Sequence, residues 1–289
     1  MFKKLFVKCK SLLILGRYNN PVGAILLMWP CYWGALASMD NEKIIHALIY
    51  FSLGSLVMRG AGCCINDIFD KKFDKEVERT KSRPLASGLL STGEALWFIV
   101  FQFMIGLLVV VQFNLHVILV SFLIIPLVIL YPIFKRITFF PQVILGLVFN
   151  WGIILGHLSQ ENNFNYDIFY LYFAGVLLTV AYDTIYGFQD IKDDKKLGLK
   201  SLAIYLEKKV HHVFTIYLLS FLMFLIFFMK NFSNIWFSII CGSIILICFT
   251  FQYISFKKGK KLISIFKSNM IYGGIISFLI FIQIIYAVK

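Results

Sequence analysis

The sequence predicts an all-α membrane protein in which nine transmembrane helices surround a central cavity and the N-terminus lies on the cytoplasmic side. Its composition is the first reason: of 289 residues, 60% are hydrophobic and only 15% are charged, and the mean hydropathy is +0.81. Soluble domains carry about 25% charged residues. The lengths of the apolar segments and the positions of the charges between them are the other two reasons.

Nine apolar windows follow one another along the chain. Each is about as long as the ~20 residues that a helix needs to cross a bilayer, whereas a barrel strand would show ~10 residues of alternating polarity. The sequence therefore predicts helices in a lipid bilayer at residues 21–39, 44–66, 95–112, 115–133, 139–158, 167–187, 211–229, 234–255 and 270–288.

The segments that flank these windows carry signals of their own. The chain begins Met1–Lys4, which resembles the basic start of a signal peptide, but no small-residue cleavage site follows, so we expect the segment to be retained. Residues Ser91–Glu94 match a helix capping box and predict an ordered start for the third helix. Pro126 and Pro132 in the fourth window and Pro141 in the fifth predict kinks or helix ends.

The basic residues lie almost entirely on one side of this topology. Of the 28 Lys and Arg residues, 24 precede the first helix or lie in connections on that same side. Cytoplasmic loops carry an excess of Lys and Arg, so this side is predicted to be cytoplasmic, with the N-terminus inside and the C-terminus outside. Topology thus accounts for the net charge of +13, and we expect no nucleic acid partner.

The acidic residues share this side, although topology makes no demand for them there. Of the 15 Asp and Glu residues, 11 are predicted to be cytoplasmic, and two clusters lie at the ends of the second and sixth helices, at residues 66–74 and 183–194. The four-helix separation suggests two similar halves around a central cavity, and the ninth helix makes the repeat approximate. No linker separates domains, so residues 1–289 are expected to form a single domain.

The first cluster has the spacing of a metal site. Asn66, Asp70 and Asp74 are one helical turn apart and share a helix face. Hard oxygen ligands suit Mg²⁺, which keeps several waters and bridges to phosphate. A solvated helix end, with the acids paired to neighbouring lysines, explains Asn66 and Asp67 poorly because both adjoin apolar residues at the membrane edge. We therefore favour metal binding by Asn66, Asp67, Asp70 and Asp74.

The second cluster extends the same argument. Asp190 and Asp194 are one turn apart, and Asp183 lies two turns before Asp190, inside an apolar window. These spacings predict that the three carboxylates share one helix face. A lone carboxylate at that depth is disfavoured by a few kcal/mol unless it pairs with a cation or binds a metal. Asp193 can be a helix-end acid neutralised by a nearby lysine. We expect Asp190 and Asp194 to bind metal and Asp183 to contribute to the same site.

Metal-loaded carboxylates require a polyanionic partner and nearby cations, and a diphosphate meets the first need. Arg79 and Arg83 follow the first cluster, and Lys135 and Arg136 end the fourth helix just after Tyr131. The planar fork of arginine can bond two phosphate oxygens at once. Taken singly, each cation is also explained by topology. Together with the acids, these residues predict a membrane enzyme that acts on a diphosphate.

Arg59 differs from the other cations because it lies within an apolar window, about two turns before Asn66. A buried arginine beside Gly60–Gly62 fits a pocket for a carboxylate group. Pairing with Asp67 or Asp183 is the alternative.

Two stretches are similar to the signature motifs of the UbiA superfamily of intramembrane aromatic prenyltransferases, closest to 4-hydroxybenzoate polyprenyltransferases of the octaprenyltransferase type. The resemblance covers residues 17–204 at several fixed spacings, and Asn20 stands where the family commonly has Asp. The matching residues are Arg17, Pro21, Gly23, Leu26-Leu27, Trp29-Pro30, Trp33, Met58-Arg59-Gly60-Ala61-Gly62-Cys63, Asn66-Asp67, Asp70, Asp74, Glu78-Arg79-Thr80, Arg83-Pro84-Leu85, Ser87-Gly88, Tyr131-Pro132, Lys135-Arg136, Tyr182-Asp183-Thr184, Tyr186, Gln189-Asp190, Asp193-Asp194, Gly198 and Lys200-Ser201.

The resemblance implies a nine-helix fold with a central cavity capped on the cytoplasmic side of a bacterial-type inner membrane. It implies that Mg²⁺ on a polyprenyl diphosphate would be held by Asn66, Asp70, Asp74, Asp190 and Asp194, supported or joined by Asp67 and Asp183. Phosphate oxygens would be bound by Arg79, Arg83 and Lys135. The carboxylate of 4-hydroxybenzoate would be oriented by Arg59.

The expected reaction is prenylation of the ring of 4-hydroxybenzoate, which gives a 3-polyprenyl-4-hydroxybenzoate for ubiquinone biosynthesis. Another acceptor, such as homogentisate, a naphthoate or haem, is the nearest alternative. A Mg²⁺ or organic-anion transporter could use the same acids, but it gains no support from Arg79, Thr80 and Arg83–Leu85.

Overall fold

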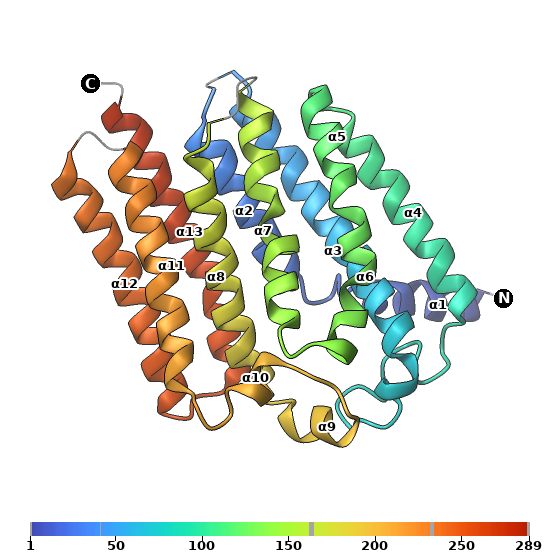
Figure 1. Cartoon of the computed structure of the whole chain (residues 1–289). Helices are drawn as coiled ribbons and strands as arrows, with labels where there is room; N and C mark the ends of the chain where they lie inside the picture. Colours follow the sequence, from blue (N-terminus) through green and yellow to red (C-terminus); the bar gives the residue numbers. More distant parts are fainter. Residues whose placement is uncertain (1, 41, 162–164, 232–233, 288–289) are drawn as a thin grey trace.

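The computed structural model describes residues 2–40, 42–161, 165–231 and 234–287. These residues form helices and connections without any β-strand, as Figure 1 shows. The helices are α1 (Phe2–Leu15), α2 (Val22–Ala37), α3 (Ile44–Asp74), α4 (Thr92–Val110), α5 (Leu115–Leu123), α6 (Ile125–Ile137), α7 (Pro141–Gln160), α8 (Ile168–Gly187), α9 (Ile191–Lys196), α10 (Leu202–Tyr205), α11 (His211–Asn231), α12 (Ile235–Lys257) and α13 (Leu262–Ala287).

The predicted class, an all-α membrane protein, is confirmed, and every predicted window contains a helix. Eight segments of the described chain are long and apolar enough to cross a membrane, with α5 and α6 together forming one of them. The remaining window corresponds to α2, which is apolar but only 16 residues long. The predicted count of nine spans therefore depends on a helix shorter than the ~20 residues usual for a span.

Several local predictions are confirmed. Ser91 caps α4 through a complete capping box with Glu94. Pro126 lies at the start of α6, directly after the break between α5 and α6 at Ile124, and Pro141 is the first residue of α7. Proline suits these positions because the first turn of a helix needs no backbone donor there.

The two acidic clusters fall on differently shaped segments. Helix α3 continues to Asp74, eight residues beyond its predicted end, so Asn66, Asp70 and Asp74 lie on one continuous helix. Helix α8 ends at Gly187 instead, and Asp190 precedes the separate short helix α9. The expectation that the second cluster shares one helix face is therefore wrong for Asp183, which belongs to α8. In Figure 1, α9 and the connection after α3 lie at the same end of the bundle.

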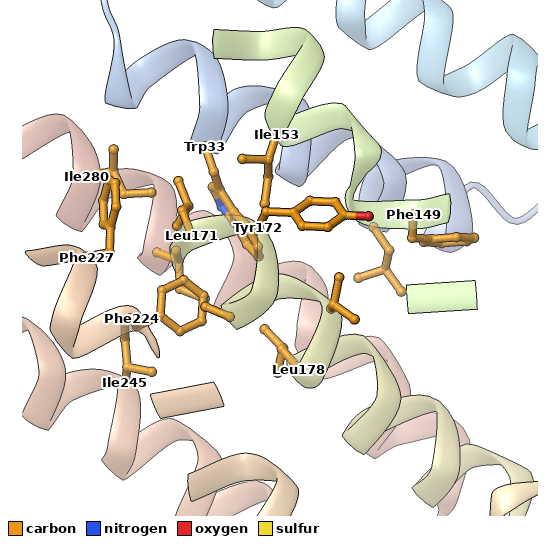
Figure 2. Packing of buried hydrophobic residues seen from close by; sticks show 14 of the residues in the cluster. Trp33, Phe149, Ile153, Leu171, Tyr172, Leu178, Phe224, Phe227, Ile245 and Ile280 are labelled. Carbon is orange, nitrogen blue, oxygen red and sulfur yellow. The ribbon is translucent and has the colours of Figure 1, made fainter. Parts of the chain in front are cut away.

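Helix α2 packs against α3, α7, α8 and α13, and small residues lie in its most extensive contact, which is with α7. A β-carbon on Gly34 of α2 would collide with the backbone of Ile153, and one on Gly156 of α7 would collide with the backbone of α2. Small residues of this kind let helix backbones approach closely in membranes. Figure 2 shows the adjoining core, where side chains such as Trp33, Leu171 and Phe224 gather between the helices.

Candidate active site

A cavity of about 980 Å³ lies between the helices and joins the two acidic clusters. Every predicted site residue except Arg136 lines it. The acids come from the ends of α3 and α8 and from α9, whereas apolar side chains such as Phe51, Phe113 and Val117 line it toward the other end of the helices. Segments more than 100 residues apart in sequence therefore form one chamber with a charged end and an apolar body.

The charged end is built first from α3, on which successive turns present Asn66 and Asp70. The Asn66 side-chain amide donates to Asp70 Oδ2 at 3.0 Å. Arg136 Nη2 is 3.8 Å from Asp70 Oδ1 and donates to the carbonyl of Phe69 at 3.0 Å. Arg136 thus contacts the cluster from outside the cavity, which differs from its predicted place among the residues that contact substrate.

Asp67 and Asp74 are engaged by arginines. The Asp67 carboxylate is 2% exposed, and both of its oxygens accept from Arg17 Nη2, at 2.9 and 2.8 Å. Arg83 Nη1 donates to Asp67 at 3.1 Å and to the Asp74 carboxylate at 3.1 and 2.9 Å. Two acids and two arginines therefore compensate each other's charge. This arrangement favours a supporting role for both Asp67 and Asp74 over the metal binding predicted for them.

Arg17 was not among the predicted site residues. It adopts a φ of 61°, and its guanidinium also donates to the carbonyls of Ile14 and Leu15 at the end of α1. Such a left-handed conformation is uncommon for a residue other than glycine. The match of Arg17 to the family pattern was the one sequence signal for its role. No pattern in the residues around Arg17 indicates that it pairs with Asp67, which lies 50 residues away.

The second cluster is tied to the first by Arg79. Its Nη2 lies 2.9 Å from Asp190 Oδ1, which links the connection after α3 to the start of α9. Burial, and then the neighbouring charge of Asp190, raises the pKa of Asp194 to about 6. Two carboxylates this close to each other are suited to share a cation.

Lys135 lies between the clusters. Its ammonium is 5.7 Å from the centre of the Tyr131 ring and interacts electrostatically with Asp70, Asp183 and Asp194. The backbone amide of Lys200 donates to the Lys135 carbonyl at 2.7 Å, so the connection after α9 is fixed to the end of α6. A cation in this place can bind a polyanion held between the acids.

Arg59 points into the cavity from α3, farther from the charged end. Its Cζ lies 5.3 Å from the centre of the Phe149 ring. No ion pair between Arg59 and a carboxylate is found among the described residues, and Asp67 is occupied by Arg17 and Arg83. The alternative in which Arg59 pairs with Asp67 is therefore excluded. Asp183 interacts with Arg59 electrostatically but forms no salt bridge with it, so the guanidinium donors remain available to a ligand.

The donor set suits Mg²⁺ in one particular way. In the described part of the chain, no three His, Cys, Asp or Glu residues form a ready-made metal cage. Mg²⁺ seldom uses such a cage, and is usually bound by one or two carboxylates, waters and substrate phosphates. The oxygens of Asn66, Asp70, Asp190 and Asp194 fit that mode, in which a substrate phosphate supplies further ligands.

Comparison with known proteins identifies close relatives in sequence. The chain is 44% identical over 191 residues to 4-hydroxybenzoate geranyltransferase 1 of Lithospermum erythrorhizon, a match that covers 66% of this chain and 62% of the relative. It is 42% identical over 197 residues to 4-hydroxybenzoate octaprenyltransferase of Aliivibrio fischeri, covering 68% and 69% respectively. The chain thus spans less than two thirds of the length of the plant relative.

Solved structures share the fold. The apo structure of a UbiA homologue from Aeropyrum pernix superposes with a TM-score of 0.77 at 21% identity, over 90% of this chain and 98% of that one. A UbiA homologue from Archaeoglobus fulgidus bound to DMAPP and Mg²⁺ gives a TM-score of 0.74 at 18% identity, over 94% and 97%. The model of the UbiA prenyltransferase family matches residues 27–273, which include both acidic clusters. The chain belongs to the UbiA prenyltransferase family.

Proposed function

We propose that this protein transfers a polyprenyl group from polyprenyl diphosphate to the ring of 4-hydroxybenzoate, giving a 3-polyprenyl-4-hydroxybenzoate for ubiquinone biosynthesis. One observation carries the proposal: a single cavity joins two acidic clusters, an apolar body and Arg59, which forms no salt bridge with a carboxylate among the described residues. These are the features that a diphosphate, a prenyl chain and an aromatic acid would each need. The names of the relatives agree, since they describe prenyl transfer to 4-hydroxybenzoate.

The donor diphosphate is bound at the charged end. Asn66, Asp70, Asp190 and Asp194 would hold Mg²⁺, and the bound ion would neutralise the charge that develops on the diphosphate as the allylic C–O bond breaks. Lys135 contributes a further positive charge from α6. The Mg²⁺ bound in the Archaeoglobus fulgidus homologue supports this assignment.

Arg83 and Arg79 act differently from each other. Arg83 bonds Asp67 and Asp74, so we assign it to holding the end of α3 in place. Arg79 is 49% exposed and bonds only one oxygen of Asp190, which leaves other guanidinium donors for a phosphate.

The acceptor binds with its carboxylate at Arg59 and its ring directed toward the donor carbon. The ring carbon ortho to the phenol attacks the allylic cation, a C–C bond forms, and the ring proton is then lost. Asp190 and the released diphosphate are the two candidates for the base. The apolar walls exclude water, which would otherwise trap the cation as an alcohol.

The decisive experiment incubates membranes containing the protein with labelled 4-hydroxybenzoate, a polyprenyl diphosphate and Mg²⁺. We expect labelled prenylated product from the wild type, loss of product after chelation by EDTA, and recovery when Mg²⁺ returns. Asp70→Ala and Asp190→Ala should lose most of the activity. Glu76→Ala is the matched control, because Glu76 is an exposed acid close to the same cluster. Full activity in both aspartate variants would contradict the assigned roles.

Two alternatives are distinguished by the same membranes. If homogentisate, a naphthoate or haem is prenylated faster than 4-hydroxybenzoate, that compound replaces 4-hydroxybenzoate as the proposed acceptor. Mg²⁺ flux in sealed vesicles without any prenyl diphosphate would favour a transporter.

We also propose that the charged end faces the cytoplasm of a bacterial-type cell, across its inner membrane. The bias of basic residues supports this side. Cys9 in α1 is exposed, and the other cysteines are buried or half-buried. A membrane-impermeant maleimide should therefore label Cys9 in inverted vesicles and leave it unlabelled in intact spheroplasts. The reverse pattern would place the site on the other side.

A further inference from the structure

The space occupied by the Arg59 guanidinium exists because residue 23 has no side chain. Gly23 lies in the first turn of α2 and lines the cavity. A β-carbon built on it would meet three atoms first, and all three belong to the Arg59 guanidinium: Nε, then Nη2 at 3.1 Å and Cζ at 3.2 Å. The Nε contact is closer than real β-carbons adopt. The guanidinium therefore packs directly on the backbone of α2.

The Arg59 guanidinium also contacts a second helix, α7. Phe149 of α7 presents its ring at 5.3 Å from Arg59 Cζ. Arginine stacks favourably on aromatic rings, and such a contact restricts the plane of the guanidinium. Arg59 is thus positioned by groups on α2 and α7, and among the described residues no ion pair with a carboxylate fixes it instead.

We propose that Gly23 is a specificity-determining residue, which sets the position of the Arg59 guanidinium and thereby the preference for an aromatic acceptor that carries a carboxylate. A methyl group at position 23 displaces the guanidinium from α2. The displaced group no longer presents its two aligned donors to the carboxylate, and alignment is what makes such a bidentate contact strong. This inference rests on the proposed function, since it takes 4-hydroxybenzoate as the acceptor.

The fold is expected to tolerate the substitution. The atoms that a β-carbon would meet are the far end of a flexible side chain. Alanine is also the better helix former of the two residues. The same change at Gly34 meets the backbone of Ile153, which cannot move without separating two helices. Gly23→Ala therefore changes the site with little effect on packing.

The test compares Gly23→Ala with Gly274→Ala. Gly274 is an interior residue of α13, lies outside the cavity lining, and has room for a β-carbon at an ordinary 3.5 Å from Trp29. Binding of 4-hydroxybenzoate to the purified proteins is measured by equilibrium dialysis. Turnover is measured with geranyl diphosphate, Mg²⁺ and either 4-hydroxybenzoate or phenol, which lacks the carboxylate.

We expect Gly23→Ala to weaken 4-hydroxybenzoate binding and raise its KM by about tenfold or more. The KM for geranyl diphosphate and kcat/KM for phenol should stay within about twofold of the wild type, as should all values for Gly274→Ala. The apparent Tm of both variants should match the wild type. Equal 4-hydroxybenzoate affinity in Gly23→Ala and the wild type would overturn the inference.

A double-mutant cycle with Arg59→Ala separates positioning from a general structural effect. If Gly23 acts through Arg59, adding Gly23→Ala to Arg59→Ala changes neither the 4-hydroxybenzoate affinity nor phenol turnover. Additive losses would overturn the inference. A wild type that binds 4-hydroxybenzoate without prenylating it would refute the proposed function and leave the Gly23 result standing. A wild type that fails to bind it would overturn both.

Discussion

Replacing Asp67 by Asn tests whether the buried charge network at the end of α3 holds the site together. Asp67 is 2% exposed and compensates Arg17 and Arg83, whose side chains are 29% and 24% exposed. The asparagine side chain removes the negative charge and turns an NH₂ group, itself a donor, toward guanidinium donors. Two arginines then lose their shared counter-charge in a largely buried setting.

Breaking a fully buried ion pair from one side costs about 3–5 kcal/mol. Solvent reaches both arginines in part and screens them, so we expect a loss of about 2–4 kcal/mol in the free energy of unfolding. For chains of this general size, 1 kcal/mol corresponds to about 2–4 °C in Tm, so the expected decrease is roughly 5–15 °C.

The assay is thermal unfolding of the purified protein in one detergent at one scan rate, followed by tryptophan fluorescence. Because unfolding in detergent is commonly irreversible, all variants are compared as apparent Tm under identical conditions. Glu78→Gln is the matched control. Glu78 is 87% exposed and pairs with Lys81 at 2.6 Å, and exposed pairs of this kind contribute little. If Asp67→Asn has the same apparent Tm as this control, the charge network does not stabilise the end of α3.

The remaining predictions concern packing, acceptor binding and pH. Gly34→Ala should lower the apparent Tm through about 1–3 kcal/mol of overpacking against the Ile153 backbone, and normal melting would show that α2 and α7 can separate freely. Arg59→Ala should raise the KM for 4-hydroxybenzoate with the donor KM little changed, and the opposite pattern in steady-state kinetics would move Arg59 to the phosphate side. Because Asp194 has its pKa raised to about 6, it becomes protonated below that pH. The Mg²⁺ concentration needed for half-maximal activity should therefore rise as pH falls through about 6, and Asp194→Asn should remove this pH dependence. A requirement that stays flat in the wild type would contradict the assignment of Asp194 as a ligand.

Much of the fold could be predicted from the sequence because apolar length and capping are local properties. The windows located the long helices, and the Ser91–Glu94 pattern located the start of α4. The predicted helix ends were less accurate where charged residues followed the apolar residues before the helix ended. Helix α3 runs on to Asp74, since its acidic face is as compatible with a helix as the apolar segment before it. The break after Gly187 had no local signal strong enough to separate Asp183 from Asp190.

By itself, the sequence determined that this is a helical membrane protein with two acidic clusters and an arginine beside small residues in an apolar segment. Only the tertiary structure decided how those charges are used. It paired Asp67 with Arg17 across 50 residues, joined Arg79 to Asp190 across 111, and placed the Arg59 guanidinium against Gly23. Charge and hydropathy are carried by each residue along the chain, whereas the choice of partner depends on which helices pack side by side.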